Sequence, residues 1–164
     1  MLLIISNCNN SGTEQWYKGN LHTHTFWSDG DAPPEITVDW YKTNGYDFLA
    51  LSDHNILSTI EKWIKVHDTD PGGWPPVMTK EKLKDIQNRF GFDWIKTRTK
   101  NDTLEMQLTT LDKLKIKFES ANEFLLIQSE EISDVYDEKP IHINATNIAE
   151  FIPPQGGNSV FDVL

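Results

Sequence analysis

The sequence predicts an α/β domain whose parallel strands carry polar residues at their carboxyl ends. Two observations predict this class. Between residues 16 and 51 the chain reads as strand, loop, helix and strand, the order of a βαβ unit. The apolar, strand-like runs then end in histidine or carboxylate side chains, and this end of a βα barrel or open α/β sheet carries the active site. The 164 residues suffice for one domain with a buried core.

The opening elements follow from local sequence signals. Residues 16–21 are predicted to form the first strand. Pro33 and Pro34 favour the first turn of a helix, and Gly45 is typical of the position after a helix ends. Residues 46–51 are short and mostly apolar, which predicts a buried second strand.

The middle of the chain, at about residues 60–120, is predicted to be an insertion over the face of the main fold. It contains a helix over residues 79–90, opened by a threonine N-cap. A hairpin is expected around Asn101-Asp102, and a further short helix over residues 111–119.

Two more strands are predicted in the last third of the chain. Residues 124–128 form an apolar run typical of a buried strand, and residues 141–145 form a fourth, short strand. Glu130 and Glu131 follow the third strand, and strand alternation places them on opposite faces, so only one can face a site there. A final helix is expected to begin at residues 156–159.

Charge and composition exclude two classes of protein. Fifteen Lys and Arg residues against 25 Asp and Glu residues give a formal net charge of −10. Because affinity for nucleic-acid backbones comes from cationic side chains, we expect no general nucleic-acid binding. No apolar run is long enough to predict a transmembrane segment, and no signal indicates an oligomeric state.

Residues 1–15 are predicted to be an N-terminal segment and linker outside the domain. A short apolar run that ends at Cys8 resembles the end of a bacterial lipoprotein signal, although a basic start is missing and Asn7 is unusual before such a cysteine. Two interpretations stay open. Lipidation of Cys8 would place the protein on the periplasmic side as an exported lipoprotein, whereas a free terminus would leave it cytoplasmic.

Candidate metal ligands lie at the ends of the predicted strands. His22 and His24 alternate at the end of the first strand, and imidazole suits Zn, Fe, Ni and Cu. Asp29 follows in a Ser-Asp-Gly turn, which can return a carboxylate beside the two histidines. His54 follows the second strand, and Asp53 beside it is expected to orient a ligand imidazole.

The remaining candidates complete the pattern. Glu131 follows the third strand, and His142 alternates with two isoleucines in the fourth. Each residue alone has a common alternative, such as turn chemistry, a surface histidine or a hydrogen-bonded core histidine. Of the five histidines, however, only His67 falls outside the strand ends and the fourth strand. The combined arrangement predicts a metal site.

Four segments resemble motifs of the PHP (polymerase and histidinol phosphatase) family. Residues 19–24 followed by residues 28–30 resemble its first motif, HxH followed by SDG. Residues 49–55 resemble the second, an apolar strand that ends in T/S-D-H. Residues 129–132 resemble the third, G-x-E-I, with serine in place of glycine, and select the second of the two glutamates. Residues 142–144 resemble the family's H-x-N/L strand.

The resemblance spans about residues 16–164 and implies a PHP domain, whose fold is a distorted (β/α)7 barrel. The family's later ligands, a further histidine and a closing D-x-H, do not occur before Leu164. A full barrel needs roughly 250 residues. We therefore expect a partial barrel of this kind, truncated at its C-terminus.

The resemblance also implies a metal-dependent phosphoric ester hydrolase. Such an enzyme binds two or three divalent ions (Zn, Mn or Fe) and hydrolyses a small phosphomonoester or phosphodiester with a metal-activated water. The implied ligand sets are His22, His24 and Glu131 for one metal, Glu131 and His142 for a second, and Asp29 and His54 for a third.

Lys96 and Arg98, on the predicted hairpin, are candidates for binding a substrate phosphate; solvated surface charge is the alternative. Other functions also stay open. An amidohydrolase-like metallohydrolase also has HxH after its first strand, although the Ser-Asp-Gly and Asp-His-Asn segments favour the PHP family. The six tryptophans would suit a non-catalytic binding module. A truncated, inactive product is the last alternative.

Overall fold

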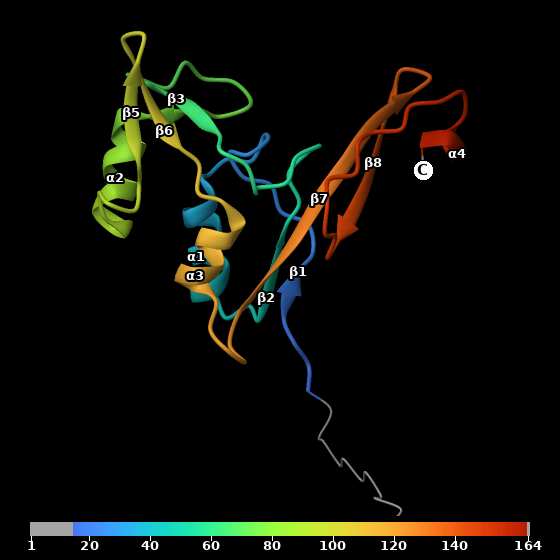
Figure 1. Ribbon diagram of the computed structural model, residues 1–164, viewed down its shortest axis with the longest axis horizontal. Coiled ribbons are helices and arrows are strands. Elements are labelled where there is room, and N and C mark those ends of the chain that lie inside the picture. The colour runs from blue at the N-terminus through green and yellow to red at the C-terminus, as the bar shows by residue number, and fades with distance from the viewer. Residues whose placement is uncertain (1–14, 164) are drawn as a thin grey trace, which may run out of the picture.

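The computed structural model describes residues 15–163 as a mixed α/β molecule with two four-stranded sheets (Figure 1). In spatial order, the first sheet contains β1 (Gly19–Asn20), β2 (Phe48–Leu51), β7 (Leu125–Tyr136) and β8 (Lys139–Thr146). The second contains β4 (Met78–Thr79), β3 (Trp63–His67), β6 (Thr103–Gln107) and β5 (Thr97–Lys100). The helices of the described residues are α1 (Pro34–Thr43), α2 (Lys80–Phe90), α3 (Leu111–Phe118) and α4 (Val160–Val163).

The expectation of a partial (β/α)7 barrel is wrong. In the first sheet, only β1, β2 and β7 run parallel, as a half-barrel sheet. β8 pairs antiparallel with β7 from Lys139 to Thr146, and the other four strands form a separate sheet. The cause lies in the turn between β7 and β8, where Asp137 and Glu138 both have positive φ, 50° and 59°. Two such residues make a tight hairpin, which leaves no room for the helical crossover that a parallel neighbour requires.

Helices α1 and α3 cover one face of the first sheet. The predicted proline-initiated helix is confirmed as α1, and Gly45 follows its end with φ of 71°. The buried side chains of this layer are Val38, Leu49, Leu51, Leu111, Leu114, Phe118, Phe124 and Leu126. Each buried leucine stabilises the fold by about 1.5–3 kcal/mol. Although α3 was expected to belong to an insertion, it packs on the main sheet. β1 is shorter than predicted, because Trp16 and Tyr17 are exposed before it.

The second sheet forms a separate layer with α2. The predicted helix and hairpin of this region are confirmed as α2 and as β5 with β6. Thr79 caps α2, since its hydroxyl accepts a hydrogen bond from the Lys82 N–H at 3.2 Å. Asn101 and Asp102 form the hairpin turn, with φ of 49° and 57°. β3 and β4 were not predicted.

The loop after β1 connects the two layers. Trp27 is only 1% exposed and packs in the core of the second sheet, beside Met78, Ile95 and Met106. Its indole N–H donates to the Thr109 carbonyl at 3.2 Å, just before α3. The loop that carries three candidate ligands, His22, His24 and Asp29, is therefore held by contacts with both layers.

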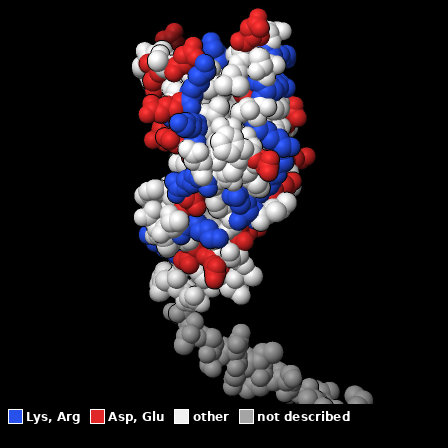
Figure 2. All heavy atoms as spheres, turned by 90° about the vertical axis from the view of Figure 1, so that its left-hand side faces the viewer, with Lys and Arg blue, Asp and Glu red and all other residues white. Residues whose placement is uncertain are grey.

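The interpretation of Cys8 as a lipidation site lies outside the described residues. Within residues 15–163, no helix combines the length and apolar character needed to cross a membrane. Figure 2 shows the face on the left-hand side of Figure 1, and Lys and Arg side chains are interspersed there with Asp and Glu side chains.

Candidate metal centre

The six predicted ligands come together where β1 and β2 end, beside the middle of β7 and β8. Their nitrogen and oxygen atoms form three overlapping groups, each with all its donor atoms within 4.8 Å of one another. These groups are His22, His24 and Glu131; His24, Asp29 and His54; and His54, Glu131 and His142. Because neighbouring groups share a histidine or the glutamate, the arrangement suits a cluster of ions better than isolated sites.

Asp53 holds the loop that carries His24 and Asp29. Its carboxylate, 2% exposed, accepts hydrogen bonds from the N–H and hydroxyl of Thr25 at 2.7 and 2.9 Å. It also accepts from the N–H and hydroxyl of Ser28 at 3.0 and 2.7 Å. Burial raises the pKa of Asp53, and these hydrogen bonds counteract that rise. Asp53 was expected to orient an imidazole directly; its hydrogen bonds instead orient the loop.

Gly30 lets the same loop close on itself. Its N–H donates to the Thr25 carbonyl at 2.9 Å. A Cβ atom on Gly30 would lie 2.4 Å from the carbonyl carbon of His24, which is too close for any side chain. The glycine of the Ser-Asp-Gly segment is therefore required for the tight return that brings Asp29 beside His24.

The contacts of His24 would suit a bound cation. Nδ1 of its ring lies 2.8 Å from Oδ1 of Asp29, where an N–H would donate. Nε2 lies 2.8 Å from Oε2 of Glu131, yet both atoms are buried and neither makes a hydrogen bond. With the hydrogen on Nδ1, Nε2 presents a lone pair to a carboxylate oxygen. A cation bound by both atoms would replace this repulsion with ligation.

Two further donor separations lie in the range of metal ligands, one lies just above it, and a fourth, from Nδ1 of His54 to Oε2 of Glu131, is shorter at 3.1 Å. Nε2 of His22 lies 3.8 Å from Oε2 of Glu131, and Nε2 of His54 lies 3.6 Å from Oδ2 of Asp29. Nδ1 of His142 lies 3.4 Å from Oε1 of Glu131. A tetrahedral ion with bonds of about 2.0–2.2 Å holds its donors about 3.3–3.6 Å apart. Imidazole nitrogen with carboxylate oxygen is a donor set suited to Zn, Mn or Fe.

The structure distinguishes the two adjacent glutamates of β7. Glu131 points into the cluster of histidines. Glu130 is also buried, but its Oε2 accepts a hydrogen bond from the Ile152 N–H at 3.2 Å, away from the histidines. This is the alternation that the sequence predicted, and Glu131 is the residue beside the histidines.

The surroundings of Asp29 favour its carboxylate form. Partial burial raises its pKa, but the hydrogen bond with His24 and the nearby His54 and His24 rings outweigh burial and hold the pKa below its usual value. An ionised carboxylate is the form that ligates a cation.

Sequence reasoning missed Ser133, which contacts two predicted ligands, and Asn144, which contacts the backbone beside a third. The hydroxyl of Ser133 lies 2.5 Å from Nδ1 of His54 and 2.9 Å from Nδ1 of His142. The side chain of Asn144 donates to the Leu21 carbonyl at 2.5 Å, which ties β8 to the end of β1. For Ser133 a signal existed, because a residue two positions after Glu131 in a strand lies on the same face.

The two candidate phosphate-binding residues belong to the second sheet and lie outside the three donor groups. Arg98 in β5 pairs with Glu105 at 2.6 Å and stacks over the Trp63 ring, with 4.0 Å to the ring centre. Lys96 is exposed just before β5. Arg98 thus forms its ion pair and its aromatic contact with residues of its own sheet.

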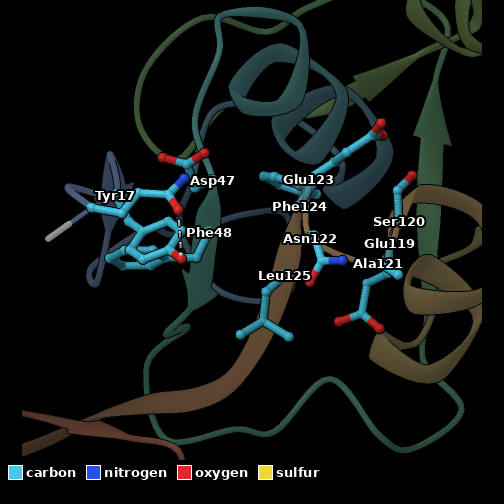
Figure 3. A pocket seen from close by; sticks show the side chains of 11 residues that line it. Tyr17, Asp47, Phe48, Glu119, Ser120, Ala121, Asn122, Glu123, Phe124 and Leu125 are labelled. Carbon is cyan, nitrogen blue, oxygen red and sulfur yellow. Dashed lines mark hydrogen bonds between the residues drawn. The ribbon is translucent and has the colours of Figure 1, made fainter. Parts of the chain in front are cut away.

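A cavity of about 630 Å³ lies at the opposite end of the first sheet. Tyr17 and Phe48 line one side, and residues 119–125, which lead into β7, line the other (Figure 3). It is formed where β2 and β7 begin, and none of the candidate ligands lines it. The candidate ligands therefore lie beyond the carboxyl end of β2 and beside the middle of β7.

Comparison of the chain with protein-family models found no match, and neither did comparison with curated proteins. The resemblance to PHP proteins accordingly rests on the four motif segments alone.

Proposed function

We propose that this chain is a metal-dependent phosphoesterase related to the PHP family, acting on a small phosphomonoester or phosphodiester. One observation carries the proposal: the buried, unpartnered Nε2 of His24 and Oε2 of Glu131 face each other at the centre of a six-residue donor set. The four motif segments support phosphoester hydrolysis among the reactions that such a donor set serves.

The candidate ligands differ in exposure: two lie buried at the bottom of the site, and two lie accessible at its edge. The side chains of Glu131 and His24 are 9% and 18% exposed, whereas those of His22 and His142 are 49% and 41% exposed. Two or three divalent ions held here would supply Lewis acidity, which lowers the pKa of a water molecule and offsets negative charge on phosphoryl oxygens. The exposed rim leaves room for a substrate to approach.

Metal counting and an activity comparison test this proposal. The purified chain is stripped of metal, exchanged against Zn²⁺ or Mn²⁺, and its bound ions are counted by mass spectrometry. Hydrolysis of p-nitrophenyl phosphate and bis(p-nitrophenyl) phosphate is then compared with that of an amide and a lactone. We expect two or three ions per chain and metal-dependent activity on a phosphoester.

The adjacent glutamates provide a matched pair of variants. We expect Glu131→Gln to lose at least one ion and to lower phosphoesterase activity by about 100-fold or more, since a bridging ligand is removed. Glu130→Gln changes the preceding residue, which lies on the opposite face of β7, and should retain both the bound ions and the phosphoesterase activity. A wild-type chain that retains no metal, or one that cleaves the amide or lactone but neither phosphoester, contradicts the proposal.

A further inference from the structure

The pairing of β2 with β7 continues beyond the end of β2. β2 ends at Leu51, but the Glu131 N–H donates to the Asp53 carbonyl at 3.2 Å, and the Asn55 N–H donates to the Glu131 carbonyl at 3.0 Å. At Asn55 the backbone enters the left-handed region, with φ of 49°, and turns away from the sheet.

The side chain of Asn55 continues the ladder where the backbone leaves it. Nδ2 donates to the Ser133 carbonyl at 2.9 Å, and Oδ1 accepts from the Ser133 N–H at 2.8 Å. The carboxamide thus pairs with Ser133 as a peptide group of a neighbouring strand would. Aspartate lacks the donor, glycine lacks both groups, and asparagine also tolerates a positive φ.

Ser133 connects the Asn55 side chain to two predicted ligands. Asn55 holds the Ser133 backbone, and the Ser133 hydroxyl lies against Nδ1 of both His54 and His142. His54 itself is bridged to Glu131 between the two backbone hydrogen bonds that extend β2. The position of both imidazoles relative to Glu131 therefore depends on how the end of β2 is joined to β7.

We infer that Asn55 is a positioning residue: its side chain joins the end of β2 to β7 and so sets the spacing of His54 and His142 to Glu131. The inference rests on the proposed function, in which these three residues hold a metal ion. Residues that orient metal ligands typically change metal affinity by about 10–100-fold when they are removed.

The test compares Asn55→Gly with Asn101→Gly. Both asparagines have φ of 49°, but Asn101 lies in the turn between β5 and β6, so glycine has the same backbone effect at both positions. Zn²⁺ affinity is measured by competition with a chelator, and exchange of the Ser133 amide hydrogen is followed by NMR in the metal-free protein. Urea unfolding checks that both variants fold.

We expect Asn55→Gly to weaken Zn²⁺ binding about tenfold or more and to speed exchange of the Ser133 amide, while Asn101→Gly changes neither. Asn55→Asp retains the acceptor for the Ser133 N–H, so it should keep the amide protected while losing part of the Zn²⁺ affinity. Equal Zn²⁺ affinity in both glycine variants would overturn the inference.

Failure of the proposed function would look different. If the wild-type chain binds no Zn²⁺, the phosphoesterase proposal is wrong. Exchange of the Ser133 amide hydrogen then tests by itself whether the Asn55 side chain joins the end of β2 to β7. Faster exchange in Asn55→Gly alone would support this connection between β2 and β7. Unchanged exchange in Asn55→Gly would overturn it.

Discussion

Asp53 shows how one buried side chain can organise a site without ligating anything. Its four hydrogen bonds reach residues that lie 25 and 28 positions earlier in the chain. They fix the loop on which His24 and Asp29 stand. Because a buried donor left unpaired costs about 1–3 kcal/mol, the free energy of this loop depends strongly on one carboxylate.

Replacement of Asp53 tests this dependence. Asp53→Ala leaves the N–H groups of Thr25 and Ser28 without their acceptor, so we expect the free energy of unfolding to fall by about 3 kcal/mol. Asp53→Asn keeps one acceptor oxygen and should lose less. Urea denaturation of the metal-free protein measures both. Asp31→Ala, an exposed acid near the same loop, serves as the control, and equal stability of the two alanine variants would contradict the prediction.

The six candidate ligands could be selected from the sequence, whereas the contacts of Asp53 and the role of Asn55 could not. His22, His54 and Glu131 each follow an apolar run, and their chemistry is visible in the residue type. The partners of Asp53 depend on a loop conformation, and the role of Asn55 depends on strand register and a left-handed φ. Neither property has a local signature in a single sequence.

At the scale of elements, β7 is the strand that links the parallel and the antiparallel parts of the first sheet. Its first half pairs parallel with β2, and its second half pairs antiparallel with β8. The helices were predictable because caps, prolines and glycines mark their ends. The hairpin was missed because Asp137-Glu138 is not the Asn-Gly pair that normally indicates a two-residue turn. The incorrect barrel came from the resemblance to the PHP family, whose fold has a parallel strand where β8 runs antiparallel.

The same turn offers a stability prediction. Both central residues have positive φ, a conformation that costs non-glycine residues about 1 kcal/mol. Changing Asp137→Asn together with Glu138→Gly should therefore raise the free energy of unfolding by about 0.5–1 kcal/mol. Glu138→Val, which is branched at Cβ, should lower it. Thermal unfolding provides the measurement, and similar midpoints for the glycine and valine variants would show that the turn conformation does not limit stability.

At the scale of the whole molecule, the candidate site joins distant parts of the chain. Its donors come from the loop after β1, from the end of β2 and from the β7–β8 hairpin, while the second sheet occupies the sequence between β2 and β7. A metal ion bound only by the folded chain would link these segments and shift the folding equilibrium.

Metal should therefore stabilise the whole fold. At 100 times the dissociation constant, a ligand specific to the native state contributes about 2.7 kcal/mol, which corresponds to a rise in Tm of about 5–10 °C for a chain of this size. Differential scanning calorimetry with Zn²⁺, and again after chelation, measures the shift. In Glu131→Gln the shift should largely disappear. A full shift in that variant would place the stabilising ion elsewhere.

The division of the chain into two sheets has a consequence for the order in which structure can form. The hairpins β5–β6 and β7–β8 close over only a few residues, and α2 is local, so all three can form early. The parallel contact of Phe48 with Leu125 must wait until the chain between them is compact. Because the donors meet only when that contact is made, the candidate metal centre would form in the last step of folding, and an ion would encounter its complete ligand set only in a nearly native molecule.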